Sequence, residues 1–181
     1  ESDTIVRASI DWSPTDSMML YAAYSEGYRP ATQNRNAGQL AANQTGACTG
    51  YVVPAVAVTD TLENIEFGFK GDITDRLRLN ATYYMSEITE LQVSRFDPSN
   101  VAFLFYIENV GDAEIDGLDV DFQWAATDNF TLHGAFSWLD TELTRVNSQL
   151  DGIAVPVGSE LPFSSEISGN VRARYDFFMD S

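Results

Sequence analysis

Apolar and polar side chains alternate along most of this chain. In the stretch 76–83, for example, apolar residues occupy the odd positions, and arginine, asparagine or threonine occupies the even ones. A β-strand places successive side chains on opposite faces, so a period of two residues predicts strands and not helices. Seven strands are predicted in this way, over residues 4–12, 18–28, 62–73, 77–93, 105–126, 130–144 and 164–178.

The apolar stripes of these strands are long. Those at 65–73, 77–85, 130–138 and 167–177 extend over about nine to eleven residues, the length that a tilted strand needs to cross a hydrocarbon layer. The cations within the predicted strands all fall on the polar face: Arg7, Lys70, Arg76, Arg78, Arg172 and Arg174. This arrangement predicts an apolar face against lipid and a polar face toward an aqueous lumen.

The connections between the strands are of two kinds. Residues 13–16, 74–76 and 127–129 form short links that contain Pro, Asp or Asn, residues that favour tight turns. The links at 29–61, 94–104 and 145–163 are long. Outer-membrane barrels have short periplasmic turns and longer extracellular loops, so the short links are predicted on the periplasmic side. Apolar-face aromatics that would form an interfacial girdle lie beside the short links: Trp12, Trp124, Phe130, Tyr175 and Phe177.

A soluble β-sandwich is the main structural alternative, because its strands alternate in the same way. Strands of soluble sheets usually contain about five or six residues, fewer than the stripes of this chain. The two folds make opposite predictions for the apolar side chains. In a sandwich, Phe67, Phe122, Phe136 and Val171 would converge between two stacked sheets, whereas in a membrane barrel they would point outward.

Composition excludes several classes of protein. No run of apolar residues approaches the roughly 18 that a membrane-spanning helix requires. The chain carries 10 Lys and Arg against 27 Asp and Glu, a net charge of −17 that would repel nucleic acid. Residues 1–7 show no targeting signal, and an odd number of strands cannot close an antiparallel barrel. We therefore expect an all-β antiparallel meander of about seven strands that is a fragment of a large transmembrane β-barrel.

Catalytic and metal sites are not indicated. His133 is the only histidine, and it lies among polar-face residues with no nucleophile motif nearby, so a lumenal polar residue is the expectation. An acidic group formed by Asp112, Glu114, Asp116, Asp119 and Asp121 invites a calcium interpretation. Its strict alternation favours a polar strand face instead. No enzyme activity, resident metal or cofactor is predicted.

Three segments carry a family resemblance. Residues 20–30 form a Tyr-rich strand that ends in Gly27-Tyr28-Arg29-Pro30, and residues 63–71 form a second characteristic strand. Residues 109–119 follow the pattern Asn-x-Gly-x-Ala-x-x-x-Gly-x-Glu, with Asp119 in place of the commoner Glu. In this order and spacing, the segments resemble the β-barrel of TonB-dependent outer-membrane receptors, and the resemblance covers nearly the whole chain.

The resemblance implies a barrel of about 22 strands with a plug domain and a TonB box. Residues 1–181 would then be part of a single barrel domain, and the plug and remaining strands would lie outside it. The implied function is import of a scarce nutrient in the bacterial outer membrane, energised by the TonB system. A ferric siderophore is the default ligand, with cobalamin and oligosaccharides as alternatives. The side chains at the predicted extracellular ends that could contact such a ligand are Tyr28, Arg29, Arg35, Arg95 and Arg145.

Two other functions remain open at this stage. A passive porin-like channel would share the barrel but would lack a plug domain. A secreted all-β carbohydrate-binding module would have an apolar core in place of an apolar exterior.

Overall fold

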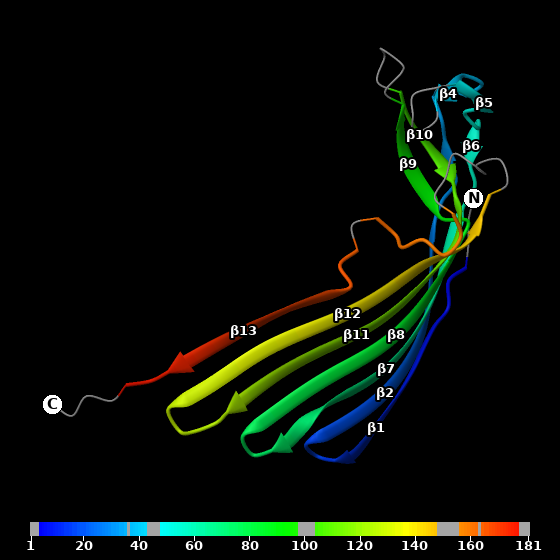
Figure 1. The fold of residues 1–181 in the computed structure, drawn as a ribbon. Helices are drawn as coiled ribbons and strands as arrows, with labels where there is room; N and C mark the ends of the chain where they lie inside the picture. Colours follow the sequence, from blue (N-terminus) through cyan, green and yellow to red (C-terminus); the bar gives the residue numbers. More distant parts are fainter. Residues whose placement is uncertain are drawn as a thin grey trace.

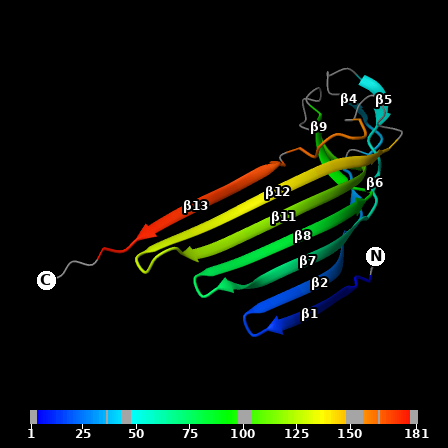
Figure 2. The ribbon, with the colours of Figure 1, turned by 60° about the horizontal axis from the view of Figure 1, so that its bottom comes forward.

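The computed structural model describes residues 4–35, 37–42, 48–97, 104–147, 156–162 and 164–177. Seven antiparallel strands form one sheet, in the order β1-β2-β7-β8-β11-β12-β13. Figures 1 and 2 show this sheet as a single curved layer. The strands are β1 (Arg7–Thr15), β2 (Met18–Arg29), β7 (Asp60–Thr74), β8 (Leu77–Thr89), β11 (Gly111–Ala125), β12 (Phe130–Val146) and β13 (Ile167–Tyr175). Each predicted strand corresponds to one strand of this sheet, with shifted ends, but the predictions 77–93 and 105–126 each run on into a second strand. Phe178, at the end of the last prediction, lies outside the described residues.

Tight turns join the strands at one end of the sheet, as the short links predict. Threonine side chains accept hydrogen bonds from the backbone in two of them. The Arg76 N–H donates to Thr74 Oγ1 at 3.2 Å, and the Asn129 N–H donates to Thr127 Oγ1 at 3.3 Å. These bonds provide acceptors for two turn N–H groups that form no hydrogen bond between strands. The predicted aromatic girdle lies at this end, where the Phe130 and Tyr175 ring centroids are 6.4 Å apart.

The apolar side chains of the sheet do not form a core. Phe67 is 51% exposed and Val171 is 72% exposed, Phe136 is also exposed, and Phe122 is half-buried. The described residues contain no second sheet packed against this face, so the sandwich alternative is excluded and the predicted all-β antiparallel sheet is confirmed. The part of the chain that the structure describes also contains no helix long and apolar enough to cross a membrane.

The register confirms that the two faces differ. On the outer face, Ala22, Phe67, Tyr83 and Leu118 are neighbours on successive strands. On the inner face, Arg78 lies opposite Gln123, and His133 lies opposite Arg172. The polar inner face thus collects the strand cations, as the alternation predicts, and His133 lies among them on that face.

Polarity reverses at the end of the sheet opposite the turns. A row of glutamates crosses five neighbouring strands on the outer face: Glu26, Glu63, Glu87, Glu114 and Glu142. On the inner face at this end, Leu62 lies opposite Ile88, which lies opposite Ala113. Ala113 packs with Val110 and Leu143 in a small buried cluster. Beyond the glutamate row, therefore, the outer face meets water and the inner face packs on the loops.

This reversal corrects the prediction for the acidic group. Glu114 and Asp116 share the outer face with Leu118, whereas Asp119 and Asp121 lie on the inner face. The acidic residues are divided between two sides of the sheet and do not form one polar face. The register also runs unbroken through Gly117, so no bulge lies there; the irregularity is between Asp112 and Ala113. Among the described residues, no cluster of three or more His, Cys, Asp or Glu side chains is placed to hold a metal ion.

Gly117 lies directly beneath an aromatic ring. A Cβ atom at this position would lie 2.2 Å from Cζ of Tyr84, whose ring covers the glycine on the inner face. The absence of a side chain at this position therefore allows the ring to lie close to the backbone.

Candidate functional site

A folded layer of loops stands on the end of the sheet opposite the tight turns (Figure 1). Three two-stranded sheets build it. They pair β3 (Thr32–Gln33) with β6 (Val56–Ala57), β4 (Leu40–Ala42) with β5 (Cys48–Val52), and β9 (Gln92–Asp97) with β10 (Leu104–Asn109). Two of the three long connections, 29–61 and 94–104, thus contain short strands that the alternation pattern did not predict. The described residues of the third, beyond the end of β12 at Val146, contain none.

The β9–β10 hairpin interrupts two predicted strands, 77–93 and 105–126. The first is broken at Glu90, whose φ of 57° lies in the left-handed region and turns the chain out of the sheet. The second is broken at Val110 and Gly111. Gly111 has a φ of 146°, and a Cβ there would lie 1.7 Å from the Arg145 carbonyl oxygen. Only glycine fits this junction, which sets the point where the hairpin leaves the sheet.

Two asparagine side chains bind the loops to one another. Asn34 donates from Nδ2 to the carbonyl oxygens of Pro54 at 2.9 Å and Ile107 at 2.7 Å, and it accepts from the Ile107 N–H at 2.8 Å. Asn109 accepts from the Val58 N–H at 2.8 Å and donates back to the Val58 carbonyl oxygen. Each side-chain amide thus donates and accepts hydrogen bonds as a backbone amide does. These bonds join residues 32–58 to the β9–β10 hairpin.

Arg29, a predicted ligand contact, lies at the base of this layer. Its guanidinium donates to Asp60, with Nε 2.8 Å from Oδ2, and to the Gln92 carbonyl oxygen at 2.9 Å. Asp60 also accepts from the Gln92 N–H at 3.1 Å, and its side chain is only 6% exposed. Arg29 neutralises a buried carboxylate and ties β2 and β7 to the hairpin.

Arg95, the second predicted contact, lies on β9 and forms an ion pair with Glu108 on β10. The side chains are 18% and 1% exposed, so this pair is largely removed from water. A buried carboxylate requires such a partner because its desolvation costs several kcal/mol. The predicted cation is therefore directed into the layer and not toward open solvent.

Arg145, near the end of β12, joins the same region from a third strand. It donates to Asp112 at 2.8 Å and to Glu90 at 2.7 Å, and Asp112 accepts from the Glu90 N–H at 2.9 Å. The hydrogen bond from Arg145 lowers the pKa of Asp112, and the hydrogen bonds to Asp112 and Glu90 raise the pKa of Arg145. This network lies beyond the glutamate row. It joins Glu90, the residue with the left-handed φ, to β11 and β12.

Tyr28 and Arg35 differ from these three arginines. Tyr28 is exposed at the end of β2, and Arg35 is exposed in the turn after β3. Within the described part of the chain, neither side chain forms an ion pair, and no hydrogen bond joins any two of the five predicted contact residues. The structure thus places all five in or beside the loop layer without gathering them into one cluster.

Sequence reasoning missed the carboxylates that engage the arginines. Asp60 lies in a predicted connection, whereas Glu90 and Glu108 lie within the two predicted strands that the hairpin interrupts, so no periodic signal singles them out. Asp60 faces Arg29 only because β2 and β7 pair in one register across a long connection. Asp112 was noted for its charge, but its role as the partner of Arg145 depends on the fold.

Comparison with known proteins identifies the architecture. The family model described as "TonB dependent receptor-like, beta-barrel" matches residues 2–180. The chain belongs to the TonB-dependent receptor family. Receptors of this family are β-barrels of the bacterial outer membrane, which places the apolar outer face of the sheet in lipid.

Individual relatives are moderately similar to this TonB-dependent receptor chain. It is 27% identical over 140 residues to a probable TonB-dependent siderophore receptor, PiuA, of Acinetobacter baumannii, covering 77% of this chain and 17% of the relative. It is 26% identical over 171 residues to the metal-pseudopaline receptor CntO of Pseudomonas aeruginosa, covering 94% and 20%. The chain thus spans about a fifth of the length of these relatives.

A solved structure supports the same fold. The ferric yersiniabactin uptake receptor FyuA of Yersinia pestis superposes with a TM-score of 0.63 at 16% identity, covering 92% of this chain and 22% of that one. At this identity the likeness concerns the fold alone. It supports the assignment of the seven-stranded sheet to the wall of a large barrel.

Proposed function

We propose that the chain is part of the barrel of a receptor that binds a ferric chelate on the extracellular side and imports it with energy from the TonB system. The family match over residues 2–180 carries this proposal. Relatives whose names include a siderophore receptor and a metal-pseudopaline receptor favour a metal chelate over cobalamin or an oligosaccharide. We also propose that the receptor transports its ligand without catalysing a chemical reaction on it.

We further propose that residues 1–181 belong to one barrel domain. The plug domain, the TonB box and the remaining strands would then lie elsewhere in the full-length receptor. The short turns would face the periplasm, and the loop layer would face the medium, where ligand arrives. This orientation agrees with the usual difference between short periplasmic turns and longer extracellular loops.

The predicted contact residues divide into two groups under this proposal. Arg29, Arg95 and Arg145 already neutralise carboxylates, so each presents little net charge to an anionic chelate. We assign to them the task of holding the loops in shape. Arg35 and Tyr28, which are exposed, are the proposed direct contacts: the guanidinium for carboxylate or hydroxamate oxygens, and the ring for stacking.

The full-length receptor tests this proposal. Affinity of the purified protein is measured for ferric siderophores, cobalamin and an oligosaccharide, followed by uptake under iron limitation. Arg35→Ala should weaken binding of the ferric chelate about tenfold, the loss of one charged hydrogen bond. Arg76→Ala, which removes an exposed arginine at a turn, is the matched control and should bind normally.

Energy dependence separates the receptor from a passive channel. Uptake should stop when TonB is removed from the strain or when the proton gradient is dissipated. Uptake that persists under both treatments would establish a porin-like channel and refute energised transport. Tight binding of cobalamin or an oligosaccharide, with no binding of ferric chelates, would overturn the proposed substrate class.

A further inference from the structure

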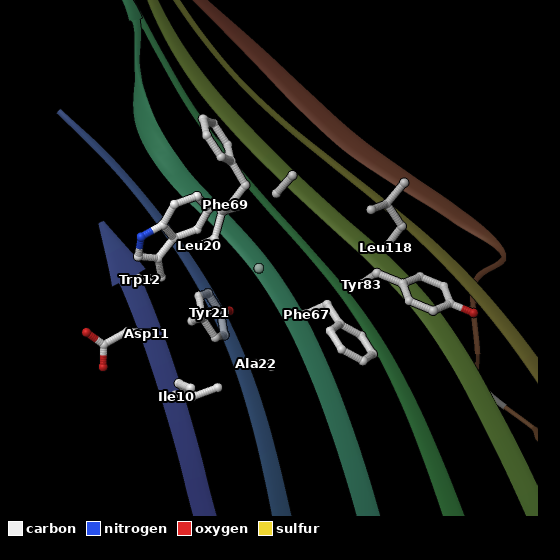
Figure 3. A pocket seen from close by; sticks show the side chains of 12 residues that line it. Ile10, Asp11, Trp12, Leu20, Tyr21, Ala22, Phe67, Phe69, Tyr83 and Leu118 are labelled. Carbon is white, nitrogen blue, oxygen red and sulfur yellow. The ribbon is translucent and has the colours of Figure 1, made fainter. Parts of the chain in front are cut away.

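An apolar recess of about 520 Å³ lies on the outer face of the sheet, across β1, β2, β7 and β8, and reaches Leu118 on β11. Figure 3 shows its lining. Two alanines, Ala22 on β2 and Ala81 on β8, lie among larger side chains. Their neighbours in the sheet are Phe67 beside Ala22 and Phe69 beside Ala81. A small residue next to a large one on each side of β7 leaves a depression in a face that is otherwise convex.

The two phenylalanines form opposite sides of this recess. In Figure 3, Phe69 lies with Leu20 and Trp12 on one side, and Phe67 lies apart on the other. The register agrees, because Trp12 is opposite Leu20 and Leu20 is opposite Phe69. The opening is therefore walled by side chains that neighbouring strands hold in place, and it is not a product of one flexible side chain.

Lipid is the expected occupant of the recess, because the outer face on which the recess lies is in contact with lipid. The recess lies within the apolar band of strands that belong to an outer-membrane barrel. Most of the lining is apolar, and Asp11 and Tyr21, which border the recess, have the register positions of the inner face. An open apolar depression offers water few partners, so in a membrane hydrocarbon is the medium that meets it. Trp12 lies near the end of β1 that leads into the turn at 16–17, and its indole N–H donates to no residue in the described part of the chain. Tryptophan is enriched at the membrane–water interface, so an ester carbonyl of a lipid is the acceptor expected for this donor.

We propose that the recess is a binding site for one acyl chain of a diacyl phospholipid, with an ester carbonyl of the lipid accepting from Nε1 of Trp12. The inference depends on the membrane placement of these strands and not on the ligand that the receptor imports. Because lipid tails are as apolar as the protein surface, the hydrophobic effect does not favour the site over bulk lipid. Binding rests on dispersion contacts within the recess and on the single hydrogen bond, so it depends on shape.

Photo-crosslinking tests the site in the full-length receptor, reconstituted in vesicles of phosphatidylethanolamine that carry a trace of the same lipid with a photoreactive acyl chain. Crosslinks should concentrate on peptides of β2, β7 and β8. Ala22→Phe and Ala81→Phe fill the recess and should lower this labelling about fivefold, since the contacts of the bound chain are lost. Ala173→Phe makes the same change on the outer face of β13 and should leave the labelling unchanged.

Trp12→Phe separates the hydrogen bond from the shape of the recess. It keeps a ring at the rim and removes the donor, so labelling should fall with fewer crosslinks near the ester end. Even labelling of the whole outer face in the unmodified receptor would refute the site, as would equal labelling in the Ala22 and Ala173 variants. Crosslinks from the recess to a second receptor molecule or another membrane protein would show a protein occupant and would also refute it.

Discussion

The Arg95–Glu108 ion pair offers a sharp test of how the loop layer is held together. Replacing Arg95 by alanine leaves the Glu108 carboxylate, 1% exposed, without its guanidinium. Removing one partner of a buried pair costs about 3–5 kcal/mol, because a charge remains in a poorly solvated site. The cost falls on the β9–β10 hairpin, since both residues lie in it. An opening equilibrium changes tenfold for each 1.4 kcal/mol, so opening of the hairpin should rise by roughly two to four orders of magnitude.

Hydrogen exchange of the full-length receptor measures this change directly. Amides of β9 and β10 should lose protection in the Arg95→Ala variant, whereas amides of β7 and β8 should keep it. Arg76→Ala is the matched control: its pair with Asp128 is 53% and 85% exposed, and should contribute less than about 1 kcal/mol. If the hairpin amides exchange equally in the two variants, the assignment of Arg95 to the support of the loops is wrong.

Three further predictions concern the rest of the sheet. Because Arg145 lowers the pKa of Asp112, this pair should stabilise the hairpin base at neutral pH and lose its effect as pH falls below about 4; Arg145→Gln should remove that pH dependence in hydrogen exchange. Gly111→Ala should yield less folded receptor, measured as heat-modifiable barrel on a gel, because its Cβ would overlap a backbone carbonyl. Phe67→Arg should destabilise the barrel in lipid by about 2–4 kcal/mol, against about 0–1 for Glu63→Arg at the boundary, as measured by denaturant titration.

The transmembrane part of the fold could be predicted because lipid imposes a simple rule on every strand. Between Leu77 and Tyr83, each residue is either apolar and outward or polar and inward, and the register confirms the division. The short turns were also predictable, since Thr74 and Thr127 act through neighbours one or two residues away. Where a strand lies in one uniform environment, a period of two residues in the sequence is sufficient to predict which side chains face lipid.

The same rule failed where the environment changes. Residues 112–116 are acidic at even positions, whereas residues 118–124 are apolar at even positions. An extra residue in the strand, which would exchange its two faces, would explain this change. A regular strand that passes from the membrane into water would explain it equally well. The unbroken register through Gly117 selects the second explanation. No alternation pattern distinguishes the two, because both change the sequence in the same way.

The candidate site was less predictable than the fold, since its charges are paired across long connections. Arg29 meets Asp60 across a separation of 31 residues, and Arg145 meets Glu90 across 55. Counting cations at the ends of strands assumes that each is free to meet a ligand. In a folded loop layer, the carboxylates of the protein compete with an anionic ligand for the same cations. A buried carboxylate such as Glu108 binds its cation preferentially, because the ion pair offsets the cost of desolvation.

The glutamate row gives the height of the hydrocarbon layer on this sheet. From Ile73, at the turn end of β7, to Glu63 is ten residues, or roughly 33 Å at about 3.3 Å per residue. A strand tilted by about 45° then spans roughly 23 Å along the membrane normal, close to the apolar band of about 25 Å found on outer-membrane barrels. Five carboxylates on adjacent strands could not lie within that band, because their desolvation would far exceed any contribution of the sheet. The row must therefore lie at the edge of the membrane, which also places the loop layer and its arginines in water.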